Sequence, residues 1–359
     1  MDEKKRNRHL QFWQPLEKGE GGYLAVNAPS GNDYVHIPRP EDPEEQWVST
    51  DYRVKVAEAH SVNTYFGQDA INNQFVNFGP GVHAAILGSE YAFTRDSVWF
   101  GGEPYIKDWS EPIKTNKEHK LFKGIEEHTR ALCAASKGRY TVSSTDIGGQ
   151  YDVLYSLRGE DLLTDFIEYP DEVIAAESEL NREFIDFFYY LTNIIEEAGC
   201  GFSSWMPIYS DIPYYPIQCD MSVMISQKMF EKFVLPSLDN VSSQIKRTIY
   251  HLDGKEQIQH LDMILSLKHV QAIQWVPSTQ AVHKSGRKNF GDFADEKSFD
   301  IYKRTLAAGK KLFLYAHADQ VPVIYETVGS DGVFIQTYCS SKKDADDLIE
   351  TAKKNWIKI

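Results

Sequence analysis

The feature that most constrains this fold is a regular alternation of short apolar runs and amphipathic segments, which starts at Arg139 and continues to the C-terminus. The apolar runs predict buried strands and the amphipathic segments predict helices. Strands that alternate with helices predict a parallel sheet covered by helices. The predicted strands are 140–143, 201–206, 248–251, 270–275, 312–315 and 332–336, and the predicted helices are 161–169, 170–198, 256–267, 298–308, 320–328 and 341–356.

The first part of the chain is less regular. Residues 1–22 form a polar lead-in, 94–112 predict a long irregular loop, and a Pro- and acid-rich loop covers 38–45. Two early strands, at 22–27 and 76–81, raise the total to eight. Helices are expected at 53–63, 82–87 and 118–136. The pattern fits both a closed barrel and an open doubly wound sheet, although the first strand lacks the GxGxxG of a dinucleotide site.

Two residues give local signals within the region after 226. Ser226 is expected to cap a helix that begins at Gln227. Pro236 lies inside the same helical pattern, and because proline lacks a backbone N–H, we expect a kink or a break there.

Composition limits the class of protein. The chain has 359 residues, of which 42% are hydrophobic and 25% charged, as expected for one globular domain over 1–359. A net charge of −14 argues against nucleic-acid binding, and the basic cluster at residues 4–8 is expected to be a solvated tail. Four dispersed cysteines give no disulfide framework, and no segment predicts a signal peptide or membrane span. We therefore expect a cytoplasmic protein without a membrane partner.

Several segments together resemble the uroporphyrinogen decarboxylase superfamily. They are His251-Leu252-Asp253-Gly254 with its neighbours 259–262 and 272–277, the run 219–236, and 157–163. The resemblance extends from Gly22 onward and is strongest after Arg139. It implies a (β/α)8 TIM barrel with an N-terminal extension and long loops at the barrel mouth. It also implies an active site at the carboxyl ends of the strands.

The superfamily includes a cofactor-free porphyrinogen decarboxylase and zinc-dependent methyltransferases that work with corrinoid proteins. The decarboxylase has substrate-gripping arginines after its first strand, whereas here residues 27–31 read Asn-Ala-Pro-Ser-Gly and only Arg39 is near. The methyltransferases have a His-x-Cys pair and a later Cys. His251 matches the histidine, Asp253 replaces the first cysteine, and Cys339 follows the last strand as the second does. The resemblance therefore implies a zinc site at these three residues.

The residues themselves leave other roles open. His251 and Asp253 are two apart at a strand end, so both can point to one side of the sheet. They could hold a metal, act as a general acid–base pair, or simply form a hydrogen-bonded Asp-Gly turn. Cys339 alone is equally typical of a small buried residue. His317 ends another strand and is a second candidate for acid–base catalysis.

Polar and aromatic residues at the other strand ends are candidates for binding a small organic substrate. These candidates are Asn27, Asp152, Trp205, Tyr209, Asp220, Gln274, Trp275 and Tyr338. Asp220 could instead bind a metal or be a solvated or helix-capping carboxylate.

The sequence thus predicts a methyltransferase of corrinoid-linked one-carbon metabolism that acts on a small organic substrate. The chain has no DxHxxG segment, so a corrinoid would be supplied by a partner protein. One alternative is a metal-free decarboxylase or lyase that uses His251 and Asp253 as acid and base. A second alternative is a non-catalytic barrel that binds a small molecule. A homodimer is compatible with all three.

Overall fold

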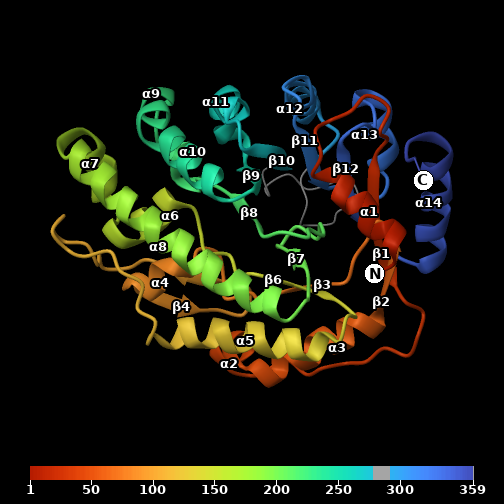
Figure 1. Ribbon diagram of the computed structural model, residues 1–359, viewed down its shortest axis with the longest axis horizontal. Coiled ribbons are helices and arrows are strands. Elements are labelled where there is room, and N and C mark those ends of the chain that lie inside the picture. Colours follow the sequence, from red (N-terminus) through yellow and green to blue (C-terminus); the bar gives the residue numbers. More distant parts are fainter. Residues whose placement is uncertain (278–291, 359) are drawn as a thin grey trace.

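A computed structural model describes residues 1–277 and 292–358 and shows a mixed α/β fold (Figure 1). Its main sheet has seven strands in the order β2-β1-β12-β11-β10-β9-β8. All neighbours in this sheet are parallel except β1 and β2, so the parallel sheet predicted by the alternation is confirmed. The strands are β1 (Tyr23–Pro29), β2 (Thr64–Gln68), β8 (Tyr214–Ile217), β9 (Arg247–Asp253), β10 (Val270–Val276), β11 (Lys311–Tyr315) and β12 (Val333–Tyr338).

A second, three-stranded parallel sheet consists of β3 (Asn73–Phe75), β6 (Thr141–Ser143) and β7 (Phe202–Ser203). Within residues 1–277 and 292–358, backbone pairing does not join the two sheets into one closed ring. The prediction of an irregular loop at 94–112 needs correction. Part of it, β5 (Val98–Phe100), pairs with β4 (Tyr91–Phe93) as a hairpin.

Helices surround the strands on the outside (Figure 1). The N-terminal half contributes α2 (Pro43–Val48), α3 (Thr50–Asn63), α4 (His83–Leu87), α5 (Lys120–Ser136), α6 (Gln150–Arg158), α7 (Asp161–Glu168) and α8 (Pro170–Glu197). The C-terminal half contributes α9 (Gln227–Met229), α10 (Leu235–Gln244), α11 (Leu261–Ser266), α12 (Glu296–Ala307), α13 (Val321–Val328) and α14 (Lys342–Asn355). Within the described residues, no helix is both long and apolar enough to cross a membrane.

The predicted signals at Ser226 and Pro236 have visible effects. The Ser226 hydroxyl accepts the backbone N–H of Met229, so the predicted cap is confirmed. Residues Phe230–Val234 form a π-helical turn immediately before Pro236, and α10 continues beyond it. Because proline cannot donate the usual backbone hydrogen bond, the irregularity falls in the turn that precedes it.

The parallel strands carry a hydrophobic core on each face. The larger core lies between the strands and the helices. The smaller core lies on the other side, which we call the inner face, and collects alternate residues of the strands because residues two apart share a face. Its strand members are Tyr23, Ala25, Tyr214, Ile249, Ala272, Phe313 and Phe334, all at most 1% exposed.

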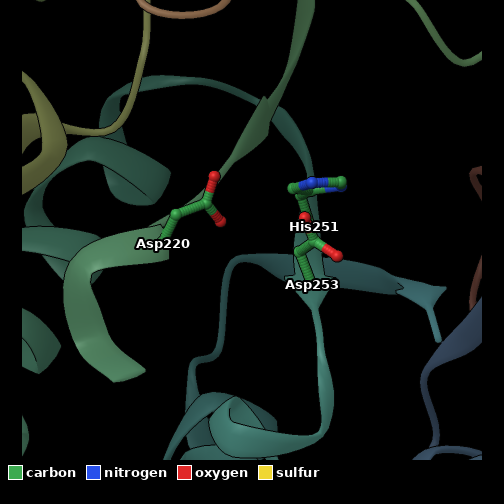
Figure 2. A group of neighbouring side chains, drawn as sticks. All are labelled: Asp220, His251 and Asp253. Carbon is green, nitrogen blue, oxygen red and sulfur yellow. The ribbon is translucent and has the colours of Figure 1, made fainter. Parts of the chain in front are cut away.

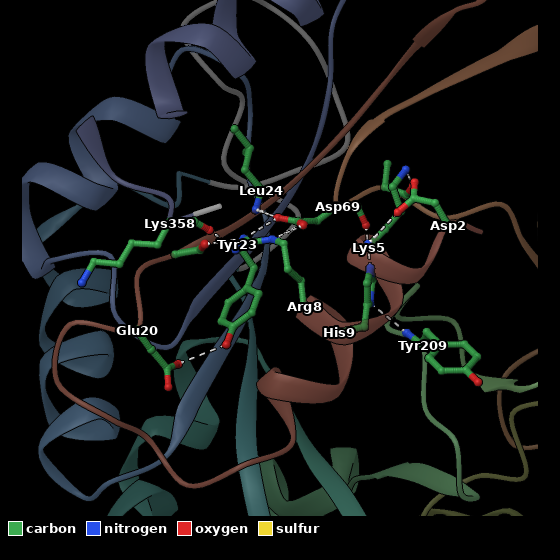
Figure 3. A network of polar contacts seen from close by, with 12 residues as sticks. Asp2, Lys5, Arg8, His9, Glu20, Tyr23, Leu24, Asp69, Tyr209 and Lys358 are labelled. Atoms are coloured by element: carbon green, nitrogen blue, oxygen red, sulfur yellow. Dashed lines mark hydrogen bonds and ion pairs between the residues drawn. The ribbon is translucent and has the colours of Figure 1, made fainter. Parts of the chain in front are cut away.

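The N-terminal segment completes the smaller core, which corrects the prediction of a solvated basic tail. Helix α1 (Glu3–Phe12) adds Phe12 to that core, and the following residue Trp13 joins it. Arg8 is buried and forms a two-point ion pair with Asp69, at 2.6 and 2.9 Å (Figure 3). The polar residues of the lead-in therefore anchor α1 to the strands.

Candidate functional site

The inner face becomes polar toward the carboxyl ends of the strands. The residues two positions beyond the apolar core members are Asn27 on β1, His251 on β9, Gln274 on β10, Tyr315 on β11 and Gln336 on β12. In parallel α/β folds, the strand carboxyl ends are where ligands bind. This polar layer, rooted in a rigid apolar one, is therefore the candidate functional site.

Three of the site's side chains, from Asp220, His251 and Asp253, converge closely enough to share one metal ion (Figure 2). One ligand atom from each lies within 4.8 Å of the others. His251 and Asp253 come from alternate positions at the end of β9, as the sequence predicted. Asp220 is presented by the 3-10 turn Asp220–Met224, which follows β8.

Gln274 determines that Nδ1 of the His251 ring carries a proton. The two residues are direct partners in the β10–β9 register, and Gln274 Oε1 lies 2.6 Å from His251 Nδ1. The same oxygen accepts the Trp205 indole N–H at 3.4 Å, and an indole can only donate. The amide oxygen therefore faces both rings, and His251 must donate from Nδ1. Nε2 is then the ring nitrogen that could bind a metal ion, since metal-bound histidines use one nitrogen while the other donates to a neighbouring acceptor.

Asp152 holds the Asp220 turn in place. Its carboxylate accepts the backbone N–H of Asp220 at 3.0 Å and of Met221 at 2.7 Å. Burial and the neighbouring Asp220 charge raise the pKa of Asp152 to about 7. Gly149 leaves room for this contact, because a Cβ there would lie 2.3 Å from Gln218 O and 2.5 Å from Asp152 Oδ2. Asp152 therefore positions Asp220 through hydrogen bonds to the backbone of the turn, whereas the sequence suggested that Asp152 contacts a substrate.

Asp146 is a site residue that the sequence reasoning missed. It follows β6, and its Oδ1 accepts from the Tyr215 hydroxyl at 3.2 Å and from the Gly148 N–H at 2.9 Å. Burial raises the pKa of Asp146 to about 6, while the charge of nearby His251 acts in the opposite direction. The sequence offered one signal for this residue: Asp146 is a carboxylate that follows a buried strand and precedes a Gly-Gly pair.

The site is rich in negative charge. Asp146, Asp152 and Asp253 all have a raised pKa, first because of burial and then because Asp220 adds a nearby negative charge. For Asp146 and Asp253, His251 opposes this shift. Such a set of oxygen donors around one imidazole suits a divalent cation, which would relieve the mutual repulsion of the carboxylates.

A cavity of about 650 Å³ adjoins this metal-binding group. It shares one wall with the group through Trp205, whose ring meets the His251 ring edge-on with centroids 6.2 Å apart. The predicted residues Asn27, His317 and Tyr338 also line it. His317 therefore belongs to the cavity wall and lies outside the group formed by Asp220, His251 and Asp253.

Three predicted site residues lie elsewhere. Trp275 is fully buried on the helix side and donates its indole N–H to Ser298, because it alternates with Gln274 along β10. Tyr209 packs against the N-terminal helix, where its backbone N–H donates to His9. Cys339 is buried in the larger core and, among the described residues, joins no group of potential metal ligands.

Comparison with known proteins establishes a likeness in fold. No protein-family model matches the chain, and no curated protein matches its sequence. A solved methyltransferase from Methanosarcina mazei aligns over 98% of this chain and 98% of its own, at a TM-score of 0.60 and 13% identity. An alignment with a structure described as an alpha-L-fucosidase from Bacteroides thetaiotaomicron covers 95% and 94%, but its TM-score is 0.26 and its identity 9%. At these identities, only the first alignment is informative, and it concerns the fold.

Proposed function

We propose that this protein is a metal-dependent methyltransferase that acts on a small organic substrate at the carboxyl ends of its strands. The observation that carries the proposal is the convergence of Asp220, His251 and Asp253 on one point, with Nδ1 of His251 bonded to Gln274. The full-length likeness to the Methanosarcina mazei methyltransferase supports this choice among the functions that such a fold can host.

The proposal includes closure of the two sheets into a (β/α)8 barrel. The inner core supports closure, because it gathers β1 and β8–β12 around one small cluster. Met206 and Ile208, which follow β7 of the second sheet, belong to the same cluster. A cluster that joins six strands of the main sheet to the segment following a strand of the second sheet is compatible with the interior of a barrel.

The residues present fit a zinc ion. One imidazole and two carboxylates are accepted zinc ligands, and three protein ligands leave a position open for a substrate atom. When bound, zinc would supply Lewis-acid polarisation of the methyl acceptor. Asp146 belongs to the same site without being one of the three ligands, and it would take the proton that the acceptor loses. Compared with the predicted ligands, Asp220 takes the place of Cys339, so a hard oxygen donor replaces a soft sulfur donor.

The methyl carrier in this proposal is a corrinoid that a partner protein brings to the open end of the site. During transfer, the carbon–donor bond breaks and a carbon–acceptor bond forms, while the acceptor's proton passes to a carboxylate. The sequence resemblance supports a corrinoid partner.

A metal-free lyase is the second candidate, and the raised pKa of Asp253 beside His251 favours it. A carboxyl whose pKa is raised by partial burial holds its proton more strongly than a solvated one, which suits a general acid. This reaction would require the same two residues without any ion.

Metal analysis separates the two functions. We expect purified protein to bind one equivalent of zinc, and Asp220→Asn or Asp253→Asn to lose most of it. Asp300→Asn, which alters a surface carboxylate on α12, is the control. Methylation of a small hydroxyl or thiol compound should then require both zinc and a methylated corrinoid protein. Wild-type protein that binds no zinc and converts its substrate in the presence of chelator would overturn the proposal.

A further inference from the structure

The cavity beside Trp205 is largely aromatic. Its volume of about 650 Å³ is in the range of pockets that bind small organic molecules. The ring-bearing residues that line it are Phe66, Phe75, Trp205, Tyr315 and Tyr338, together with His60 and His317. Such walls favour a flat, unsaturated ligand, which can stack on them or meet them edge-on.

Two amide oxygens of this cavity's lining have no hydrogen-bond partner among the described residues. Gln336 is 6% exposed, and its amide nitrogen donates to the Thr337 carbonyl at 3.3 Å. Because only nitrogen can donate to a carbonyl, the orientation of this amide is fixed, and its unpaired atom is the acceptor Oε1. Asn27 Oδ1, on the neighbouring strand β1, is also buried and unpaired.

Unpaired buried acceptors are costly, so a site that retains them is suited to a ligand that donates to them. Ligand charge is limited as well. Among the residues that the structure describes, the lining includes no lysine, arginine, aspartate or glutamate. These residues therefore offer no permanent charge to offset the desolvation of a carboxylate or a phosphate.

We propose that this cavity binds an uncharged aromatic compound with an O–H or N–H donor, which pairs with Gln336 Oε1 and Asn27 Oδ1. Trp205 forms the wall shared with His251, so a ring in the cavity lies beside the metal-binding group. The inference rests on the proposed function only in treating this compound as the methyl-transfer substrate. Binding itself requires neither metal nor corrinoid.

The test is isothermal titration of the full chain with three matched probes. They are 4-methoxyphenol, which has a donor, 1,4-dimethoxybenzene, in which the donor is capped, and 4-methoxybenzoate, which is anionic. We expect 4-methoxyphenol to bind about tenfold more tightly than the capped probe, the effect of one buried hydrogen bond. The anion should bind most weakly.

Gln336→Met removes the fixed acceptor at similar volume. This variant should bind 4-methoxyphenol about tenfold more weakly than wild type and should bind the capped probe with nearly the same affinity. Gln244→Met, on the exposed surface of α10, is the matched control. If Gln336→Met does not fold, as judged by circular dichroism, Asn27→Leu tests the same selectivity at the other acceptor.

Equal binding of all three probes, tightest binding of the anion, or unchanged selectivity in both variants would overturn the proposal. Its failure is distinguishable from that of the proposed function. Asp253→Asn should keep the preference for the phenol while losing zinc, whereas Gln336→Met should keep zinc while losing the preference.

Discussion

Gln274 and His251 are direct neighbours across β10 and β9, and the amide oxygen of the first lies 2.6 Å from Nδ1 of the second. The contact selects the ring tautomer, because an amide oxygen accepts and never donates. Gln274 is therefore a positioning residue whose effect should appear in metal affinity and in the pH dependence of that affinity.

Gln274→Leu should weaken zinc binding about 10- to 100-fold, as loss of a histidine's outer hydrogen bond does elsewhere. Titration calorimetry with zinc measures this directly. Gln274→Glu keeps an acceptor and should retain most of the affinity. Gln259→Leu, on the turn after β9, is a control that should bind like wild type. Equal affinity in Gln274→Leu and wild type would contradict the assigned tautomer.

Gly149→Ala should damage the site without touching any potential ligand. The new Cβ would lie 2.3 Å from Gln218 O and 2.5 Å from Asp152 Oδ2, so the Asp220 turn must move. We expect about 1–3 kcal/mol less stability in urea unfolding, together with weaker zinc binding. Gly31→Ala adds a Cβ that meets nothing within 4 Å and should leave zinc binding intact. Normal zinc affinity in Gly149→Ala would show that the turn is not held as described.

His9 should make the protein sensitive to acid. Burial lowers the pKa of His9 from 6.5 to about 4, since the ring is fully enclosed and bonded at both nitrogens. The folded pKa lies below the unfolded one. Stability is therefore fully present above about pH 6.5 and is lost as the pH falls toward 4, by about 2–3 kcal/mol at pH 4.5.

His9→Gln should flatten this loss, as measured by urea unfolding between pH 7 and 4.5. The raised pKa values of Asp146 and Asp152 act in the opposite direction, so the difference between variant and wild type at each pH is the informative quantity. His36→Gln, at an exposed position, should leave the slope unchanged. Parallel curves for His9→Gln and wild type would refute the role of His9.

Arg8→Met should strongly destabilise the fold. It leaves Asp69, whose side chain is 1% exposed, without its cationic partner. Removing one member of a buried pair costs about 3–5 kcal/mol, whereas breaking an exposed pair costs less than about 1 kcal/mol. Lys55→Met, which removes the exposed pair with Asp51, is the comparison. Similar unfolding free energies for the two variants would rule out an anchoring role for α1.

Most elements after Arg139 were predictable because they combine a clear apolar period with clear ends, but helix α6 and the short strand β8 were not predicted. The strand around His251 and the placement of His251 beside Asp253 followed from alternation alone. Alternation also explains the error at Trp275. Gln274 and Trp275 are consecutive, so only one can face the site, and the sequence does not say which face is inward.

The remaining errors concern long-range contacts. The basic residues near the N-terminus suggested a solvated tail, because their partner Asp69 lies far along the chain. Asp146 belongs to a separate loop that reaches the site only after folding, so no spacing rule links it to His251. Cys339 was assigned to the site by analogy with a family pattern. It directly follows β12, and its side chain packs in the larger core instead.

The position of α1 has a consequence for the order of events during synthesis. Phe12 packs on Phe334 of the last strand, with ring centroids 5.6 Å apart, and Trp13 packs on Tyr214 at 4.6 Å. Helix α1 therefore cannot complete its packing until β12, which lies far along the chain, has been synthesised. Until then the aromatic residues of α1 lack their native partners and are exposed to non-native contacts.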